Sequence, residues 1–231
     1  MEQPQAIGRA LCFGGRLSLD TAALGGLQEH VNTLQDISSI LLVGVGSSFN
    51  AASYGAKLFK HAGVFANVVA MDANATEDSD FKQFKMKSSK SGVVALSQSG
   101  ETQEIINTVQ LAQRNMVPVM SVVNEVGSTV ANMTKCGVYT NAGPEKAFLS
   151  TKSFTSQVVC LALMSMWFRQ TKGKDGTDQS LAESLQRLPI SFGMLMRTQS
   201  VCKKAAKKLL PKEHCFVLGK GESRNIISGT V

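Results

Sequence analysis

Short apolar runs alternate along the chain with segments whose apolar residues recur at helical spacing. The runs typical of buried strands are residues 38–44, 64–71, 93–96, 117–124 and 137–139. The helical spacing lies between them, at residues 47–62, 101–115 and 128–133. Strand–helix alternation at this spacing is typical of βαβ units. We therefore expect an α/β fold, a three-layer sandwich in which helices cover both faces of a parallel sheet.

The flanks of this region have a helical pattern. Residues 24–34 predict a short helix within a lead-in segment, 1–36. Further helices are predicted over 151–169 and from 179 to about 209, the second broken near Pro189 and stopped by Pro211, because proline lacks the N–H that a helix needs. Residues 72–90 are polar and rich in lysine, which indicates a helix plus a loop. The predicted division is a lead-in of 1–36, an α/β domain of 37–172 and a helical connector of 173–213.

A turn rich in hydroxyl groups, residues 97–102, stands where a predicted strand ends and a predicted helix begins. Helix N-termini carry free N–H groups and partial positive charge, so they attract anions. Ser97, Ser99 and Thr102 would add donors around Gly100. A capping box of Ser99 with Glu101 or Thr102 would explain only part of this set. The turn therefore predicts a site for a phosphorylated small molecule.

Two other segments are candidates for the same site, since ligands of parallel sheets bind at the carboxyl ends of the strands. Residues 44–48 form a Gly-Val-Gly-Ser-Ser turn that lacks the third glycine of a dinucleotide-binding fingerprint. This turn fits a ligand site and a plain helix cap by Ser47 about equally well. The third segment consists of the turn 141–145 and of Ser150 and Thr151, which would begin a helix. The neighbouring Lys152 fits a solvated or salt-bridged lysine better than a catalytic one.

A short internal repeat links residues 41–48 to residues 216–223, since both read as an apolar strand followed by Gly-x-Gly-x-Ser. The repeat predicts that 214–231 begins a second copy of the α/β domain, with a strand at 216–218 and the remainder beyond the sequence. On this interpretation the chain is one domain followed by the start of another.

Composition narrows the classes of function. The chain has 231 residues, 43% of them hydrophobic, and a formal net charge of +7. Two lysine runs contribute to that charge, at 82–90 and 203–212. The first lies beside Phe81 and Phe84, a weak indication of single-strand nucleic-acid binding, but solvated helix faces explain both runs more simply, so no nucleic-acid partner is expected. Five scattered cysteines without a CxxC motif favour free buried thiols over disulfides or a metal site. No cofactor is expected. No stretch has the length of a membrane span or the form of a signal peptide.

At the hydroxyl-rich segments the chain resembles glutamine–fructose-6-phosphate aminotransferases (isomerising). The resemblance rests on 96–102 and on 141–145 with 150–157, and it extends from about residue 2 to about residue 221. The Ser-Gln-Ser-Gly of 97–100 by itself indicates the wider sugar isomerase (SIS) superfamily. The resemblance implies a SIS fold, a fructose 6-phosphate or glucosamine 6-phosphate ligand, a cytoplasmic location and a homodimer formed through SIS domains.

The resemblance also implies roles for individual residues. The positions that would bind the sugar phosphate are Ser48, Ser97, Gln98, Ser99 and Thr102. Those that would contact the sugar are Gly46, Ser47, Phe148 and Ser150. Phe148 departs from the small residue of the family and would narrow the pocket. The catalytic lysine, glutamate and histidine of the family belong to its second half and its glutaminase domain precedes this region, so no catalytic residue is expected here. The alternative is a non-catalytic module that senses phosphosugars.

Overall fold

Five parallel strands form one sheet with the order β2-β1-β3-β4-β5. The computed structural model describes residues 2–18, 20–87, 90–146, 150–173, 178–214 and 216–220. The strands are β1 (Ser39–Gly44), β2 (Asn67–Asp72), β3 (Ser91–Ser97), β4 (Val119–Val123) and β5 (Gly137–Tyr139). Each coincides with one of the apolar runs, so the predicted α/β class with a parallel sheet is confirmed.

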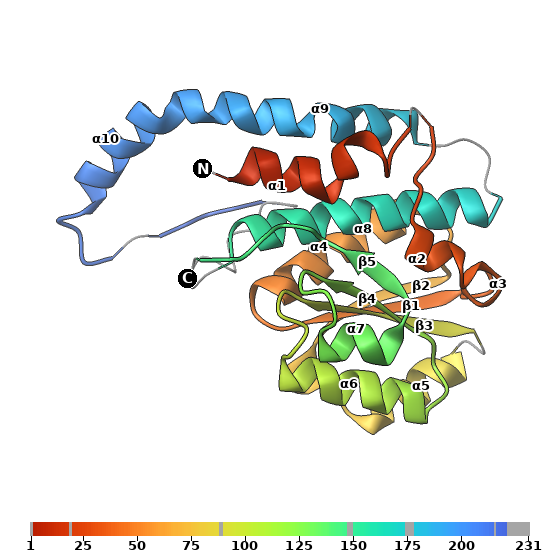
Figure 1. Cartoon of the computed structure of the whole chain (residues 1–231). Helices are drawn as coiled ribbons and strands as arrows, with labels where there is room; N and C mark the ends of the chain where they lie inside the picture. The colour runs from red at the N-terminus through yellow and green to blue at the C-terminus, as the bar shows by residue number, and fades with distance from the viewer. Residues whose placement is uncertain are drawn as a thin grey trace.

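Helices cover both faces of the sheet (Figure 1). One face carries α4 (Ser47–Ala62) and α8 (Lys152–Thr171), and the other carries α5 (Asp78–Lys87), α6 (Gln103–Arg114) and α7 (Thr129–Thr134). Outside α8 lie α1 (Gln3–Ala10) and α9 (Gln179–Leu195), which add a further layer to the predicted three. The shorter elements are α2 (Gly25–Gln28), α3 (Val31–Leu34) and the 3-10 turns Cys12–Gly14, Ala73–Ala75 and Met196–Thr198.

The core explains why the strands read as continuous apolar runs. Successive side chains of a strand point to opposite faces, and both faces of this sheet are covered. Leu42 and Leu96 therefore pack with α4 and α8, whereas Leu41 and Ala95 pack with the helices of the other face. Every residue of β1 and β3 is buried as a result.

Three helical predictions differ from the structure. The helix α1 was not predicted, because its buried residues are mostly small and its apolar pattern is short. Residues 24–34 form two short helices, α2 and α3, instead of one. The predicted break near Pro189 is wrong, since α9 runs through this proline and ends at Leu195. Leu185 before it and Phe192 after it pack against the same core, and this packing offsets the hydrogen bond that proline removes.

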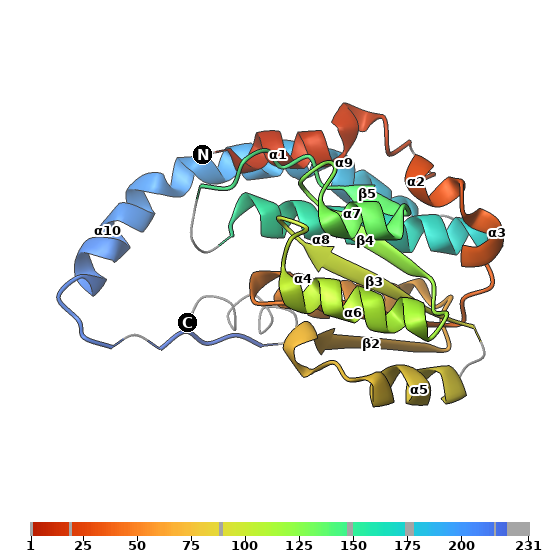
Figure 2. The ribbon, with the colours of Figure 1, turned by 60° about the horizontal axis from the view of Figure 1, so that its bottom comes forward.

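The last helix, α10 (Gln199–Leu209), extends away from the domain (Figures 1 and 2). All its residues are exposed, which confirms a solvated face for the lysines of 203–208. The predicted strand at 216–218 is not formed: residues 216–220 have no regular structure, and Phe216 is 90% exposed. This segment is not one of the five strands of the described sheet.

The first lysine run lies on α5 and the loop after it. Phe81 is completely buried in the core beneath the sheet, so it anchors the helix and cannot serve as a stacking platform for bases. Lys82 is paired with Asp78 at 2.6 Å, and Lys90 is paired with Asp36 at 3.0 Å. Both ion pairs are exposed to solvent, as expected if these lysines lie on a solvated surface.

Candidate functional site

Two of the three predicted segments meet at the carboxyl edge of the sheet. β1 and β3 are parallel neighbours, with Val43 paired to Ala95, so the turns that follow them lie side by side. The chain order reverses at this point, because β2 lies on one side of β1 and β3 on the other. Such a switch point is where open α/β sheets bind their ligands. The fold thus brings residues 44–48 and 97–102 to one place.

The β3–α6 turn is shaped by its own hydroxyl groups. Ser97 Oγ accepts a hydrogen bond from the Gly100 N–H at 2.9 Å and lies 3.1 Å from Thr102 Oγ1. Ser99 Oγ accepts from the Glu101 N–H at 3.1 Å. Ser97 is only 2% exposed, whereas Gln98, Ser99 and Thr102 are partly exposed. Ser97 therefore acts from inside the turn, and the other three form its accessible surface.

A second set of contacts fixes this turn to the β4–α7 turn. Gly100 has φ of 68°, and a Cβ added there would lie 2.1 Å from Ser128 Oγ, so a side chain could not be accommodated. The Val130 N–H donates to the Gly100 carbonyl at 3.0 Å, and the Asn124 N–H donates to the Gln98 carbonyl at 3.2 Å. The position of the β3–α6 turn is consequently determined by the neighbouring turn of the sheet.

Glu101 completes this connection and corrects the capping prediction. Its carboxylate accepts from the Thr129 N–H at 2.8 Å and from Thr129 Oγ1 at 2.7 Å. Glu101 therefore caps α7. The alternative of a capping box at the start of α6 is not observed: the N-cap residue there is Thr102, with no side-chain cap bond. The hydrogen bonds from the Thr129 side chain and backbone hold the pKa of Glu101 below its ordinary value of 4.5.

The lowered pKa of Glu101 makes a pH-dependent contribution to stability. Since the folded pKa lies below that of the unfolded chain, the contribution is present above pH 4.5 and is lost as the pH falls through the folded pKa. We expect Glu101→Gln to lower the free energy of unfolding at neutral pH, and the difference from the native chain to shrink in acid. Urea unfolding over a pH series measures this. Glu104→Gln, on the next turn, is the control, and a difference that does not vary with pH would contradict the assignment.

The β1–α4 turn presents Gly46, Ser47 and Ser48. Gly46 is the N-cap residue, with φ of 57°, and Ser47 is the first residue of α4, so the alternative in which Ser47 caps the helix is not observed. Ser48 is buried, and its Oγ accepts from Gln157 Nε2 of α8 at 3.0 Å. This bond also shows that α4 and α8 begin at the same edge of the molecule, since both residues lie near the N-terminal ends of their helices.

The third predicted segment leads into α8. Glu145 caps this helix: its Oε2 accepts from the N–H groups of Thr151 and Ser153, each at 3.1 Å. Ser150 is half-buried just before the helix, and Phe148 lies outside the described residues. Lys152 is nearly buried and ion-paired with Glu2, the residue just before α1, as the salt-bridge interpretation expects. This pairing lowers the pKa of Glu2.

The helix N-termini at this edge fall into two groups. Glu101 and Glu145 cap α7 and α8, so an anion would meet a carboxylate there. Among the described residues, no side chain caps α4 or α6. In α4 the Ser48 and Phe49 N–H groups already donate to the Val45 and Gly46 carbonyls at 3.1 and 3.0 Å, so these helix ends attract a ligand chiefly through their partial positive charge. The predicted hydroxyl groups lie in the first turn of α4 and, for α6, at its N-cap and in the turn before it, so an anion would be favoured at this position.

Sequence reasoning missed three residues that support the site. Asn124 Oδ1 accepts from the Ala142 N–H at 2.7 Å, and Arg9 Nη2 donates to the Ala142 carbonyl at 2.7 Å. Together they hold the 141–145 loop between β4 and α1. Gln157 is the third, through Ser48. Gln157 is the last polar residue before the apolar run that begins at Val158, which does not single it out, and nothing local indicated Arg9 or Asn124.

The described part of the chain shows neither a metal-binding cluster nor a membrane-spanning helix. It contains no grouping of three His, Cys, Asp or Glu residues suited to a metal ion. Burial raises the pKa of Cys136 and of Cys160 to about 12, which keeps both as thiols, while Cys12 and Cys202 are exposed. None of the helices in the described ranges is both long and apolar enough to cross a bilayer.

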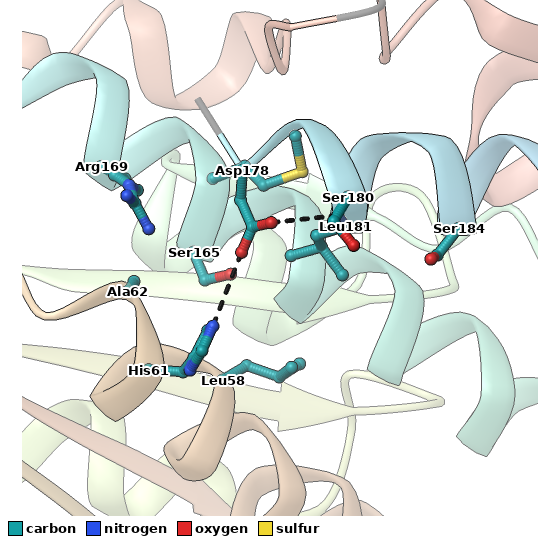
Figure 3. Close-up of a pocket in the computed structure, with 10 residues that line it drawn as sticks. Leu58, His61, Ala62, Ser165, Arg169, Asp178, Ser180, Leu181 and Ser184 are labelled. Atoms are coloured by element: carbon teal, nitrogen blue, oxygen red, sulfur yellow. Dashed lines mark hydrogen bonds and ion pairs between the residues drawn. The ribbon is translucent and has the colours of Figure 1, made fainter. Parts of the chain in front are cut away.

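A separate pocket of about 250 Å³ lies between α4, α8 and α9 (Figure 3). In it His61 Nε2 lies 3.7 Å from Asp178 Oδ2, and Asp178 Oδ1 accepts from the Leu181 N–H at 3.0 Å. Arg169 and several serines complete its lining. It is at the C-terminal end of α4, opposite Ser47 and Ser48, so it is distinct from the predicted site.

Comparison with known proteins places these features in context. The SIS domain family model matches residues 33–166. The chain is 29% identical, over 95% of its length, to a glutamine–fructose-6-phosphate aminotransferase [isomerizing] of Chlorobaculum tepidum, and 28% identical, over 95%, to such an aminotransferase of Arabidopsis thaliana. It spans only 35% and 32% of these relatives. The C-terminal domain of glucosamine-fructose-6-phosphate aminotransferase from Francisella tularensis has the same fold, with a TM-score of 0.81, 22% identity, and coverage of 97% of this chain and 62% of that one.

Proposed function

Since the chain belongs to the SIS domain family, we propose that it binds a sugar phosphate at the carboxyl edge of its sheet. The observation that carries the proposal is the pair of N-termini of α4 and α6, which no described side chain caps and which stand side by side. Hydroxyl groups lie in the first turn of α4, and at the N-cap of α6 and in the turn before it. A phosphate has several peripheral oxygens and needs donors from more than one direction. Two adjacent helix N-termini and serine or threonine hydroxyls supply such donors.

The proposed ligands are fructose 6-phosphate and glucosamine 6-phosphate. The names of the relatives contain the first of these. The phosphate would be bound by the residues around the two turns, Ser48, Ser97, Gln98, Ser99 and Thr102. The sugar would extend toward the start of α8 and contact Gly46, Ser47, Phe148 and Ser150. Ser97 contributes through the turn that it shapes, because its hydroxyl is buried.

We further propose that this chain is the phosphosugar-binding part of a glutamine–fructose-6-phosphate aminotransferase (isomerising), which makes glucosamine 6-phosphate for the synthesis of UDP-N-acetylglucosamine. The chain itself would bind and orient the ligand without transforming it. Lys152, which follows Ser150 and Thr151, is buried and ion-paired with Glu2, so it is a poor candidate for an amine that forms an imine. A cytoplasmic location and a homodimer formed through SIS domains belong to the same proposal.

Calorimetric titration of the chain with fructose 6-phosphate tests this function. We expect saturable binding, and a loss of about tenfold or more in affinity for Thr102→Val or Ser99→Ala, since each removes a hydrogen bond to a charged group. Unphosphorylated fructose should bind far more weakly. Thr33→Val and Ser184→Ala, at exposed positions away from the site, are matched controls. Absence of binding, or binding that neither site variant weakens, would reject the proposal.

A further inference from the structure

We propose that Gln157 is a positioning residue that directs the hydroxyl proton of Ser48 toward the ligand phosphate. The inference rests on the proposed function, because it concerns the same site. It assigns a role to a side chain that lies on a different helix from Ser48 and is too deeply buried to serve as an open surface for the ligand.

The contact between the two side chains is enclosed. Gln157 is 1% exposed and Ser48 is 8% exposed, and the distance from Gln157 Nε2 to Ser48 Oγ is 3.0 Å. Burying an amide among apolar neighbours costs free energy unless it is hydrogen-bonded. On α8 the neighbours of Gln157 include Val158 and Val159, which pack against the apolar core. The bond to Ser48 compensates this cost, so the geometry of the pair is well determined.

The direction of the bond decides what Ser48 can offer. A serine hydroxyl has one proton to donate and two lone pairs that accept. When the Gln157 amide donates to Ser48 Oγ, a lone pair is occupied and the proton points elsewhere. Ser48 is the second residue of α4. The Val45 carbonyl, three residues earlier, accepts from the Ser48 N–H at 3.1 Å, but among the described residues Ser48 Oγ makes no bond to it, unlike serines inside helices that donate to the preceding turn. The proton is left for a ligand that accepts hydrogen bonds.

In the β3–α6 turn, too, an N–H group donates to a serine hydroxyl. The Gly100 N–H donates to Ser97 Oγ, which lies 3.1 Å from Thr102 Oγ1. Ser97 keeps a second lone pair, so either hydroxyl can donate in this contact. When Ser97 is the donor, the Thr102 proton is left to point into the site. In both turns a buried N–H thus occupies one lone pair of a serine hydroxyl and leaves its proton for another acceptor. Such an arrangement favours a group that only accepts, such as a phosphate dianion, over a sugar hydroxyl.

A double-mutant cycle between Ser48 and Gln157 tests the inference, with fructose 6-phosphate and inorganic phosphate as the ligands. Gln157→Met keeps an unbranched side chain of similar length but removes the N–H. We expect Ser48→Ala to weaken binding by about tenfold in the native background and by less than about threefold in the Gln157→Met background. A role of Gln157 in packing alone would lower thermal stability and leave the cost of Ser48→Ala unchanged, and this result would overturn the inference.

Gln157→Glu provides a second measurement with a side chain of the same shape. Its carboxylate would accept the Ser48 proton that the phosphate needs, so affinity relative to the native chain should fall at neutral pH. The loss should diminish in acid, as the carboxyl group becomes protonated and can donate again. A loss that does not vary with pH would count against the proposed direction of the bond. This variant also keeps the test decisive if Gln157→Met fails to fold.

Gln170→Met is the matched control, because Gln170 lies on the same helix and its amide bonds the Ala22 backbone at 3.0 and 2.7 Å. It should lower stability while the cost of Ser48→Ala stays the same. If the native chain binds neither ligand, the proposed function fails and the inference with it. If the native chain binds and Thr102→Val weakens binding, but the cycle is additive, only the inference fails.

Discussion

Replacement of Gly44 by alanine is expected to displace the first turn of α4 and to weaken phosphate binding. Gly44 ends β1 directly beneath this turn, and an added Cβ would lie 2.5 Å from the Ser48 carbonyl group and 2.6 Å from the Phe49 nitrogen. All of these atoms belong to the backbone, so no side chain can rotate away to make room. Overpacking of this kind typically costs ~1–3 kcal/mol of stability. Ser48 would move with the turn, away from Gln157.

Urea unfolding and calorimetric titration with fructose 6-phosphate would measure both effects of Gly44→Ala. Gly25→Ala is the matched control, because an added Cβ there meets nothing within 4 Å. The control should keep its stability and affinity. If Gly44→Ala retains both as well, the close approach of β1 to α4 does not determine the position of Ser48.

Replacement of Asn124 by alanine should have the largest effect on the scaffold of the site. The Asn124 side chain is 8% exposed. Its Oδ1 accepts from Thr140 Oγ1 at 3.0 Å and from the Ala142 N–H at 2.7 Å, and its Nδ2 donates to the Gly143 carbonyl at 3.2 Å. Truncation leaves these groups without their partner. We expect a loss on the order of 3 kcal/mol in the free energy of unfolding, since buried groups left unsatisfied cost ~1–3 kcal/mol each.

Thermal and urea unfolding of Asn124→Ala would measure this loss. Asn132→Ala is the control: Asn132 makes one side-chain bond, to the Gly127 carbonyl at 2.9 Å, and that bond is exposed, so its removal should cost less than about 1 kcal/mol. Equal effects of the two variants would show that Asn124 does not hold the 141–145 loop. Asn124→Ala should also weaken sugar binding more than Asn132→Ala, because this loop leads to Ser150.

The positions of the strands and of the helices between them could be predicted because each depends on a local pattern. The helix predicted over 47–62 coincides with α4, and the strand predicted over 137–139 coincides with β5. The resemblance of 97–102 and 141–157 to a known family located the candidate site. By contrast, α1 has a weak local pattern, and its position depends on partners such as Lys152 and Asn141, more than 130 residues away.

Capping illustrates the same limit. A capping box is a local rule, and as an alternative explanation of the turn it would place Glu101 at the start of α6. In the structure Glu101 caps α7, at Thr129, because the sheet brings successive turns to one edge. Glu145 caps α8 from only six to eight residues away. Pro189 is a related case, since a local rule ends the helix there whereas packing on both sides of the proline carries α9 onward.

The sequence by itself determined which groups stand at the ends of β1 and β3: glycines that permit tight turns and hydroxyls that suit an anion. These follow from residue types and short spacings. Only the tertiary structure decided which helix N-termini have no side-chain cap among the described residues and which N–H groups donate to the serine hydroxyls. Ser48 meets Gln157 across 109 positions of sequence, and Ser97 is oriented by the folded turn. Hydrogen-bond direction depends on which donor is nearest in space, and no local pattern of residues contains that information.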